Sequence, residues 1–281
     1  MVVTDARGPE GPLFIDGKLY YLQWVSGTLS VWDGQKSMVL NDTADCGHNG
    51  LALTKQNTFF VTCSHDPGAI LELDKTGKVL RSWDTDGTGQ KFAGGLNDVV
   101  IAADGGAYAT AFGPALATPT SVAGKLFYLP PGGSNWTKVA DDLNYANGVG
   151  ISPDQKTLYV SQTVSNSILQ FNIGKDGTLS DRADFAVLSS LTDSGSRSPW
   201  LGPDSMKVDG EGNVFVAQWF GGKVLKLSPK GELLHEFDIP EGDGTTNIAF
   251  SPDATDLYVT VVKDANDPDA KGSIVKIKNV Q

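Results

Sequence analysis

Six oxygen-bearing side chains recur along the chain at one position of a repeated pattern. They are Glu10, Asn49, Asn97, Asn147, Asp204 and Asn247, roughly 40 to 57 residues apart. Asparagine and aspartate are common in turns, but turn preference does not explain a glutamate at the same position. If the six side chains converge, two carboxylates and several amide oxygens would form a cage of the kind that hard divalent cations prefer.

The repeats that carry these residues predict an all-β fold. Each copy, such as "ANGVGISPDQKTLYVSQT", has a polar residue, a short strand, a Gly/Asp/Asn-rich turn and a second strand. A third strand follows, as in "GKLFYLP" and "GKVLKLS". This period predicts a six-bladed β-propeller with four-stranded antiparallel blades around a central channel. We expect one domain over 1–281, with blades starting near 10, 49, 97, 147, 204 and 247, and residues 1–9 closing the last blade.

The propeller topology places the six polar residues in a ring at one mouth of the channel, because the first strand of each blade lines the channel. Without a cation, the carboxylates of Glu10 and Asp204 would face each other and repel. We therefore expect one divalent cation, Ca²⁺ in the first place, with Mg²⁺, Mn²⁺ or Zn²⁺ as alternatives. Zinc is less well matched, because the ring has no His and Cys ligand set.

The loops that follow the second strands should form the rim of this mouth. Aromatic and amide side chains there are typical of a small-molecule pocket. The candidate substrate-binding residues are Asn49, Asn97, Phe112, Gln162 and Trp219. The candidate catalytic residues are Asp204, His48 and His65. Two polar insertions, 114–124 and 189–200, interrupt the repeats and are either spacer loops or part of the binding face.

Composition excludes several kinds of partner. The chain has 22 Lys and Arg against 33 Asp and Glu, a formal net charge of −11. This balance argues against nucleic acid and anionic membranes, so we expect a small-molecule substrate and a monomer or weak homo-oligomer. The start of the chain has no signal-peptide pattern, which favours the cytoplasm, although a mature exported fragment would look the same. We expect Cys46 and Cys63 to be separate, buried, small apolar groups.

The motifs around the ring resemble those of the SMP-30/gluconolactonase/LRE-like family of six-bladed propellers. The resemblance is carried by "EGP" at Glu10, "NDVV" at Asn97, "ANGVGIS" at Asn147 and "GPDSM" at Asp204, in that order. "HNGLAL" and "CSH" in the second repeat are similar to the family's bacterial drug-responsive lactonase branch. The resemblance implies that Glu10, Asn147 and Asp204 bind one cation directly. It also implies that Asn97 is a further ligand or a substrate contact, with Ser205 adding an oxygen near the ion.

Two positions depart from the family pattern. The lactonase branch has an aspartate, its proposed general base, where this chain has Ala111 in "YATAFG". Animal sugar-lactonases have an arginine two residues before the Asn-Asp pair, where this chain has Gly95. The first departure leaves the general base open among Asp204, His48 and His65, with Asp98 as a further candidate, although an aspartate at the entry to a strand more often bonds backbone. The second argues against sugar-acid lactones as substrates.

By this resemblance we expect a metal-dependent hydrolase that opens a lactone or a related cyclic ester. In that reaction the metal polarises the carbonyl and activates water. Two alternatives stand beside it: a non-catalytic metal- or ligand-binding propeller, and a strictosidine-synthase-like enzyme of other chemistry. The ring counts against the latter, because such a condensation favours a lone buried glutamate over a full set of metal ligands.

Overall fold

The computed structural model describes residues 1–92, 94–114 and 117–280, and nearly all of its regular structure is β-strand. Residues 115 and 116 of the first predicted insertion lie outside the described residues. The first four blades are separate four-stranded sheets. Their strands are β2 (Pro9–Ile15), β3 (Lys18–Gln23), β4 (Thr28–Trp32) and β5 (Ser37–Asn41); β6 (His48–Leu53), β7 (Phe59–Cys63), β8 (Ala69–Leu73) and β9 (Val79–Trp83); β10 (Leu96–Ile101), β11 (Ala107–Ala111), β12 (Gly124–Leu129) and β13 (Thr137–Leu143); β14 (Ala146–Ile151), β15 (Thr157–Gln162), β16 (Ser167–Ile173) and β17 (Leu179–Val187).

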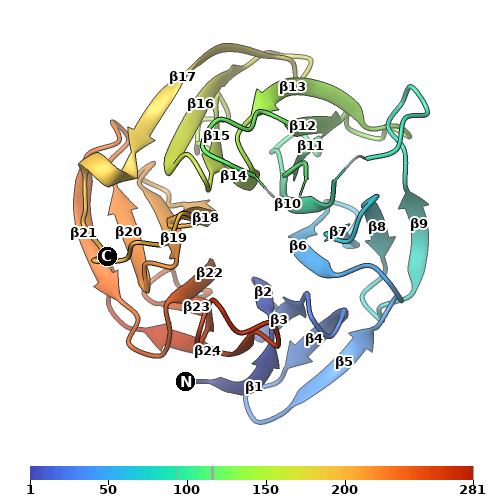
Figure 1. The fold of residues 1–281 in the computed structure, drawn as a ribbon. Helices are drawn as coiled ribbons and strands as arrows, with labels where there is room; N and C mark the ends of the chain where they lie inside the picture. The colour runs from blue at the N-terminus through green and yellow to red at the C-terminus, as the bar shows by residue number, and fades with distance from the viewer. Residues whose placement is uncertain (93, 115–116, 281) are drawn as a thin grey trace.

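The last two blades join in one sheet through a single pair, Trp219 opposite Gly244. Blade five has β18 (Gly202–Val208), β19 (Val214–Trp219), β20 (Lys223–Leu227) and β21 (Leu233–Asp238). Blade six has β22 (Gly244–Phe250), β23 (Leu257–Val262), β24 (Lys271–Ile277) and the N-terminal strand β1 (Val3–Arg7). A short 3₁₀ turn, η1 (Leu188–Ser190), follows β17. The predicted six-bladed propeller is confirmed, and Figure 1 shows the first strand of each blade nearest the channel.

The N-terminal and C-terminal strands pair with each other inside blade six. Strand β1 runs antiparallel to β24, with Val3 opposite Ile274. Val3 and Ile274 then pack in one buried cluster with Leu19 and Tyr21 of blade one. Similar buried clusters lie between the other neighbouring blades. Because burial of apolar surface drives folding, these clusters hold the ring of blades closed and keep the channel residues in place.

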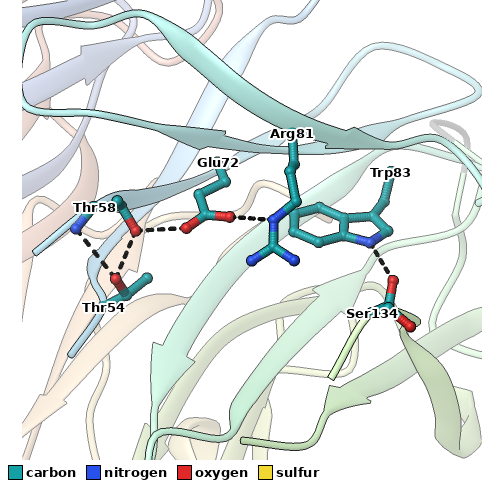
Figure 2. A network of polar contacts seen from close by, with 6 residues as sticks. All are labelled: Thr54, Thr58, Glu72, Arg81, Trp83 and Ser134. Atoms are coloured by element: carbon teal, nitrogen blue, oxygen red, sulfur yellow. Dashed lines mark hydrogen bonds and ion pairs between the residues drawn. The ribbon is translucent and has the colours of Figure 1, made fainter. Parts of the chain in front are cut away.

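A polar network ties blade two to blade three (Figure 2). The buried Glu72 carboxylate accepts hydrogen bonds from the Thr58 hydroxyl at 2.8 Å and the Arg81 Nε at 2.6 Å. The Arg81 guanidinium lies 4.9 Å from the ring centre of Trp83. The Trp83 indole N–H donates to the Ser134 carbonyl of blade three at 2.6 Å. The network therefore satisfies a buried carboxylate and adds a directional contact between blades.

Cys46 and Cys63 form a disulfide, so the prediction that they are separate thiols is wrong. Strand pairing explains the contact: His48 is opposite Cys63, and the Cys46 carbonyl accepts a hydrogen bond from the His65 N–H at 3.2 Å. The two Cα atoms are consequently only 4.5 Å apart. The bond joins the segment entering β6 to the end of β7, close to Asn49 and Ser64.

None of the helices in the described residues is long and apolar enough to cross a membrane.

Candidate metal centre at the channel mouth

The ring residues sit at β-bulges. In every inner hairpin the pairing register shifts by one residue near the mouth, for example between His48 and Leu51 and between Pro203 and Met206. The shift contains Asn49 and Asp204 in these two blades. A bulge places an extra residue on one strand and re-aims its side chain, and bulges are common beside active sites. The repeated bulge therefore explains why the same repeat position faces the mouth in blades two to five, whereas in blade one Glu10 is still paired with Leu22 and directly precedes the shift.

The register corrects the predicted ring in blade six. In blade five the ring residue Asp204 directly follows Pro203, the last paired residue before the shift. In blade six that last paired residue is Thr245, so the equivalent position is Thr246 and not Asn247. Thr246 is also one of the residues that line the mouth cavity. The prediction that Asn247 belongs to the ring is therefore wrong by one residue.

Threonine hydroxyls hold the ring strands of neighbouring blades in register. Thr62 in blade two donates to the backbone carbonyl of Asn97, and Thr110 in blade three donates to that of Asn147. Thr163 donates to the Pro203 carbonyl at 2.8 Å. In the last blade Thr246 donates to the carbonyl of Pro9 at 2.8 Å. These buried bonds fix the backbone directly at, or next to, four ring positions.

The six ring residues share one cavity of about 250 Å³ with aromatic and hydroxyl side chains. The lining residues are Glu10, Asn49, Asn97, Asn147, Asp204 and Thr246 from the ring, and Trp24, Ser64, Phe112, Tyr145, Thr163, Trp200 and Trp219 from the rim. Phe112 stacks on Tyr145 at 5.0 Å between ring centres. No Lys, Arg or His side chain is among the lining residues of the described chain. The floor is therefore acidic and amide-rich, and the walls are largely aromatic.

The chemistry of the donor set fits a hard cation. The side-chain oxygens of Asn49, Asn97 and Asn147 are buried and have no hydrogen-bond partner within the described residues. An unpaired buried carbonyl oxygen is costly, and three at one site call for a partner that accepts oxygen ligands. Within the same part of the chain no three His, Cys, Asp or Glu residues come close enough to hold a metal. A cation here would therefore need amide oxygens in addition to Glu10 and Asp204.

Electrostatics at the mouth favour a bound positive charge. The pKa of Glu10 is raised to about 8, chiefly by burial; the hydrogen bond from Asn247 lowers it, and the neighbouring Asp98 carboxylate raises it. Burial also raises the pKa of Asp204 well above its usual range, and the nearby charge of Glu10 adds to this effect. Both shifts arise because a buried carboxylate loses hydration and faces like charge. A cation would offset both effects.

Three predicted site residues lie away from this cavity. Gln162 uses both ends of its amide within blade four, accepting from the Asn144 N–H at 2.8 Å and donating to the Ser167 hydroxyl at 3.0 Å. His48 is fully buried, its Nε2 lies 2.7 Å from the Asn41 side-chain oxygen, and burial lowers its pKa to about 4. His65 is exposed and lines a separate groove beside the mouth. Of the three catalytic candidates, only Asp204 lines the cavity.

Tyr145 and Trp200 are aromatic residues of the rim that were not part of the predicted site. Tyr145 directly precedes β14, with a backbone φ of 45°, and burial raises its pKa to about 12. Trp200 contacts Tyr145 at 5.1 Å between ring centres. Trp200 is the last residue of the insertion 189–200, so a bulky aromatic residue ending an insertion just before a ring strand was the available signal. Nothing in the sequence pattern marks Tyr145.

The glycine at position 95, where animal sugar-lactonases have an arginine, has a steric explanation. A Cβ at this position would overlap the carbonyl oxygen of Ser64 and approach the Phe112 ring to 2.7 Å. No side chain fits there unless the Ser64 loop moves. An arginine that contacts substrate from this position is therefore incompatible with the arrangement of the rim in this chain.

The fold and this mouth define a six-bladed propeller with an oxygen-rich centre. Residues 8–263 match the SMP-30/gluconolactonase/LRE-like region, and the chain belongs to that family. Pentonolactonase XacC of Haloferax volcanii is 28% identical over 271 residues, which cover 92% of this chain and 83% of the relative. Regucalcin of Pongo abelii is 27% identical over 241 residues, covering 85% and 77%. Lactonase Drp35 of Staphylococcus saprophyticus is 29% identical over 182 residues, which cover 61% of this chain and about half (52%) of that relative.

Solved structures agree with this assignment. A gluconolactonase from Xanthomonas campestris superposes with a TM-score of 0.77 and 26% identity, over 99% of this chain and 88% of that one. A calcium-binding regucalcin from Agrobacterium tumefaciens has a TM-score of 0.78 at 21% identity, over 98% and 90%, and supports the fold.

Proposed function

We propose that this chain is a lactonase that depends on one divalent cation, Ca²⁺ in the first place, held at the channel mouth. Glu10, Asn147 and Asp204 would bind the cation, and Asn97 would serve as a further ligand or a substrate contact. The observation that carries the proposal is the convergence of two carboxylates and three unpartnered amide oxygens on one cavity. Relatives across most of the chain, including pentonolactonase and gluconolactonase, support the reaction class.

Each group in the mouth then has a chemical task. The bound cation would polarise the ester carbonyl and make water more acidic. Asp204 is the one candidate base that lines the cavity. We therefore assign it the role of general base, which accepts the proton that water loses as it adds to the carbonyl carbon. The ring C–O bond then breaks, and the departing alkoxide takes up a proton to give the open hydroxy acid. The aromatic walls would hold the lactone ring in place.

The lining residues also narrow the substrate. Because no cationic side chain lines the described cavity, a carboxylate or phosphate on the lactone would have no protein counter-charge. We therefore propose an uncharged lactone or related cyclic ester. The three tryptophans and Phe112 in the lining favour a lactone with an apolar face over a lactone that is bound mainly through its hydroxyl groups.

A lactone panel tests this function. Protein stripped with chelator and reloaded with Ca²⁺, Mg²⁺, Mn²⁺ or Zn²⁺ would be assayed for acid release from apolar, aromatic and sugar lactones. We expect turnover with metal, loss on chelation, and no turnover by Asp204→Ala. Hydrolysis that survives complete metal removal would refute the metal-dependent reaction. Cation binding without turnover of any lactone would instead favour the non-catalytic binding propeller.

A further inference from the structure

Asn247 is held by hydrogen bonds on every polar atom. Its side-chain oxygen accepts from the Ile248 N–H at 2.8 Å and from the Lys207 ammonium at 3.4 Å. Its side-chain nitrogen donates to Glu10 Oε2 at 2.7 Å. Its backbone N–H donates to the Thr260 hydroxyl at 2.9 Å. The side chain is 1% exposed, so these partners alone decide its orientation.

This set of partners allows only one orientation of the amide. A flipped Asn247 would point its NH₂ group at the Ile248 N–H and at the Lys207 ammonium, both of which are donors. It would also turn its oxygen toward the Glu10 carboxylate. The first contact is repulsive in every state, because an amide nitrogen cannot accept, and the second is repulsive once Glu10 is ionised as a cation ligand. Lys207 and Ile248 therefore fix the direction in which Asn247 donates.

Asn247 in turn fixes one oxygen of Glu10. Glu10 Oε2 accepts from the Gly11 N–H at 2.8 Å and from Asn247, whereas Oε1 has no hydrogen bond within the described residues. The Glu10 side chain lines the mouth cavity. With Oε2 committed to two donors, Oε1 is the oxygen left for a ligand in the cavity.

The equivalent position in blade three makes the same local bond without an amide donor. Asp98 corresponds to Asn247, because the backbone N–H of each donates to a threonine hydroxyl of the next strand, Thr110 and Thr260 respectively. Its Oδ1 accepts from the Val99 N–H at 2.8 Å, as Asn247 accepts from Ile248. An aspartate at both positions would preserve that local bond. Only an amide, however, can also donate to a neighbouring carboxylate. The local turn thus does not account for asparagine at position 247.

We propose that Lys207 and Asn247 are positioning residues that act as a relay, from ammonium to amide to carboxylate, and hold Glu10 in its cation-binding orientation. The inference rests on the proposed metal centre and assigns to it two residues beyond the ring. Outer partners of this kind orient metal ligands, and their loss commonly costs about 10- to 100-fold in affinity.

Cation binding tests the relay without reference to turnover. Tb³⁺, which takes the oxygen ligands of Ca²⁺, would be titrated and detected by luminescence excited through the tryptophans lining the cavity. Ca²⁺ would be measured by calorimetry. We expect Asn247→Leu to weaken binding by about tenfold and Lys207→Met by a few-fold, with Lys207→Arg close to wild type. In the double variant, Lys207→Met should add almost nothing to Asn247→Leu, because Lys207 acts through Asn247.

The control is Asn213→Leu, the same change at a buried asparagine in the β18–β19 turn, where the side chain bonds Asp209 at 2.8 Å. It should lower the melting temperature but leave cation affinity unchanged. If Lys207 were merely a nearby positive charge, Lys207→Met would strengthen cation binding, and that result would overturn the relay. Independent, additive effects of the two changes, or an unchanged affinity in Asn247→Leu, would also overturn it. If wild-type protein binds neither ion, the metal centre itself fails, and the relay fails with it.

Discussion

Glu10 on β2 and Asp204 on β18 come from blades one and five, yet both line one cavity, and the charge of Glu10 raises the pKa of Asp204 beyond the effect of burial. Two buried carboxylates of like charge destabilise a folded protein that has no cation between them. A bulge begins directly after Glu10 and another contains Asp204, and such bulges re-aim side chains toward the mouth. A cation would thus contribute to stability as well as to chemistry.

Without divalent cations, stability should fall as pH rises. The folded-state pKa of Glu10 is about 8 against an ordinary value of 4.5, so folded protein keeps a proton that unfolded protein releases between these values. The stabilisation from this group is complete below about pH 4.5 and lost as pH rises through about 8. Melting curves in chelator from pH 5 to 8 would measure it. Glu10→Gln should gain in melting temperature over wild type as pH rises, and a constant gap would contradict the shift.

Removing the charge of Asp204 should abolish turnover. Asp204→Asn keeps the shape but weakens the ligand and removes the assigned base, so we expect kcat to fall at least about 100-fold and cation affinity to drop. Asp209→Asn, in the turn at the other end of β18, is the matched control. Its carboxylate accepts hydrogen bonds within its own turn, from the Glu211 N–H at 2.9 Å and from the Asn213 N–H and side-chain amide at 2.8 Å each. Full activity in Asp204→Asn would remove this residue from the mechanism.

Placing the family's aspartate at position 111 should not improve the enzyme. Ala111 is 1% exposed and packs in an apolar cluster with Leu96 and Phe127, and it does not line the cavity. Burying a carboxyl group there without partners should cost on the order of 3 kcal/mol of unfolding free energy. Chemical denaturation of Ala111→Asp, beside lactone turnover at low temperature, would measure both effects. A stable variant with faster turnover would mean that the rim can rearrange to use this base.

The disulfide should stabilise the second blade and the pocket wall beside it. Cys46 and Cys63 are separated by 17 residues, and a loop of that size suggests about 3 kcal/mol. Changing both cysteines to serine should therefore lower the unfolding free energy and raise KM, because Asn49 and Ser64 are adjacent to the bond. Denaturation with and without reductant would check this. The double variant should be insensitive to reductant, and a wild type equally insensitive would contradict a stabilising bond.

The repeat pattern predicted the propeller and most of the mouth, because both depend on features that recur with the period of a blade. Glu10, Asn97, Asn147 and Asp204 could be aligned in that way, and the structure brings them to one cavity. Blade six could not be aligned to the residue, because "TTN" offers oxygen atoms at both Thr246 and Asn247, and only the bulge register separates them.

Contacts between residues that are distant in the sequence could not be predicted from it. The disulfide depends on the pairing of His48 with Cys63. Gln162 does not face the cavity because its amide is hydrogen-bonded to Asn144 and Ser167 of its own blade. Neither follows from residue type or spacing. The same holds for Tyr145, whose place in the wall is set by its contacts with Phe112 and Trp200. The disulfide joins the only two cysteines of the chain, both in one blade, so no alignment of the repeats could reveal it.

Trp200 should control substrate binding more than catalysis. Its ring meets Tyr145 edge-on, while Trp24 and Trp219 approach each other at 6.3 Å elsewhere in the lining. Trp200 is half-buried, and within the described residues its side chain makes no hydrogen bond to a ring residue. Trp200→Ala should therefore leave kcat and cation affinity near wild type. The KM for apolar lactones should rise about tenfold, in line with the loss of an aromatic contact. Trp200→Phe should recover most of the affinity. If Trp200→Ala instead lowered kcat without changing KM, the insertion 189–200 would act on the reacting centre and not on substrate binding.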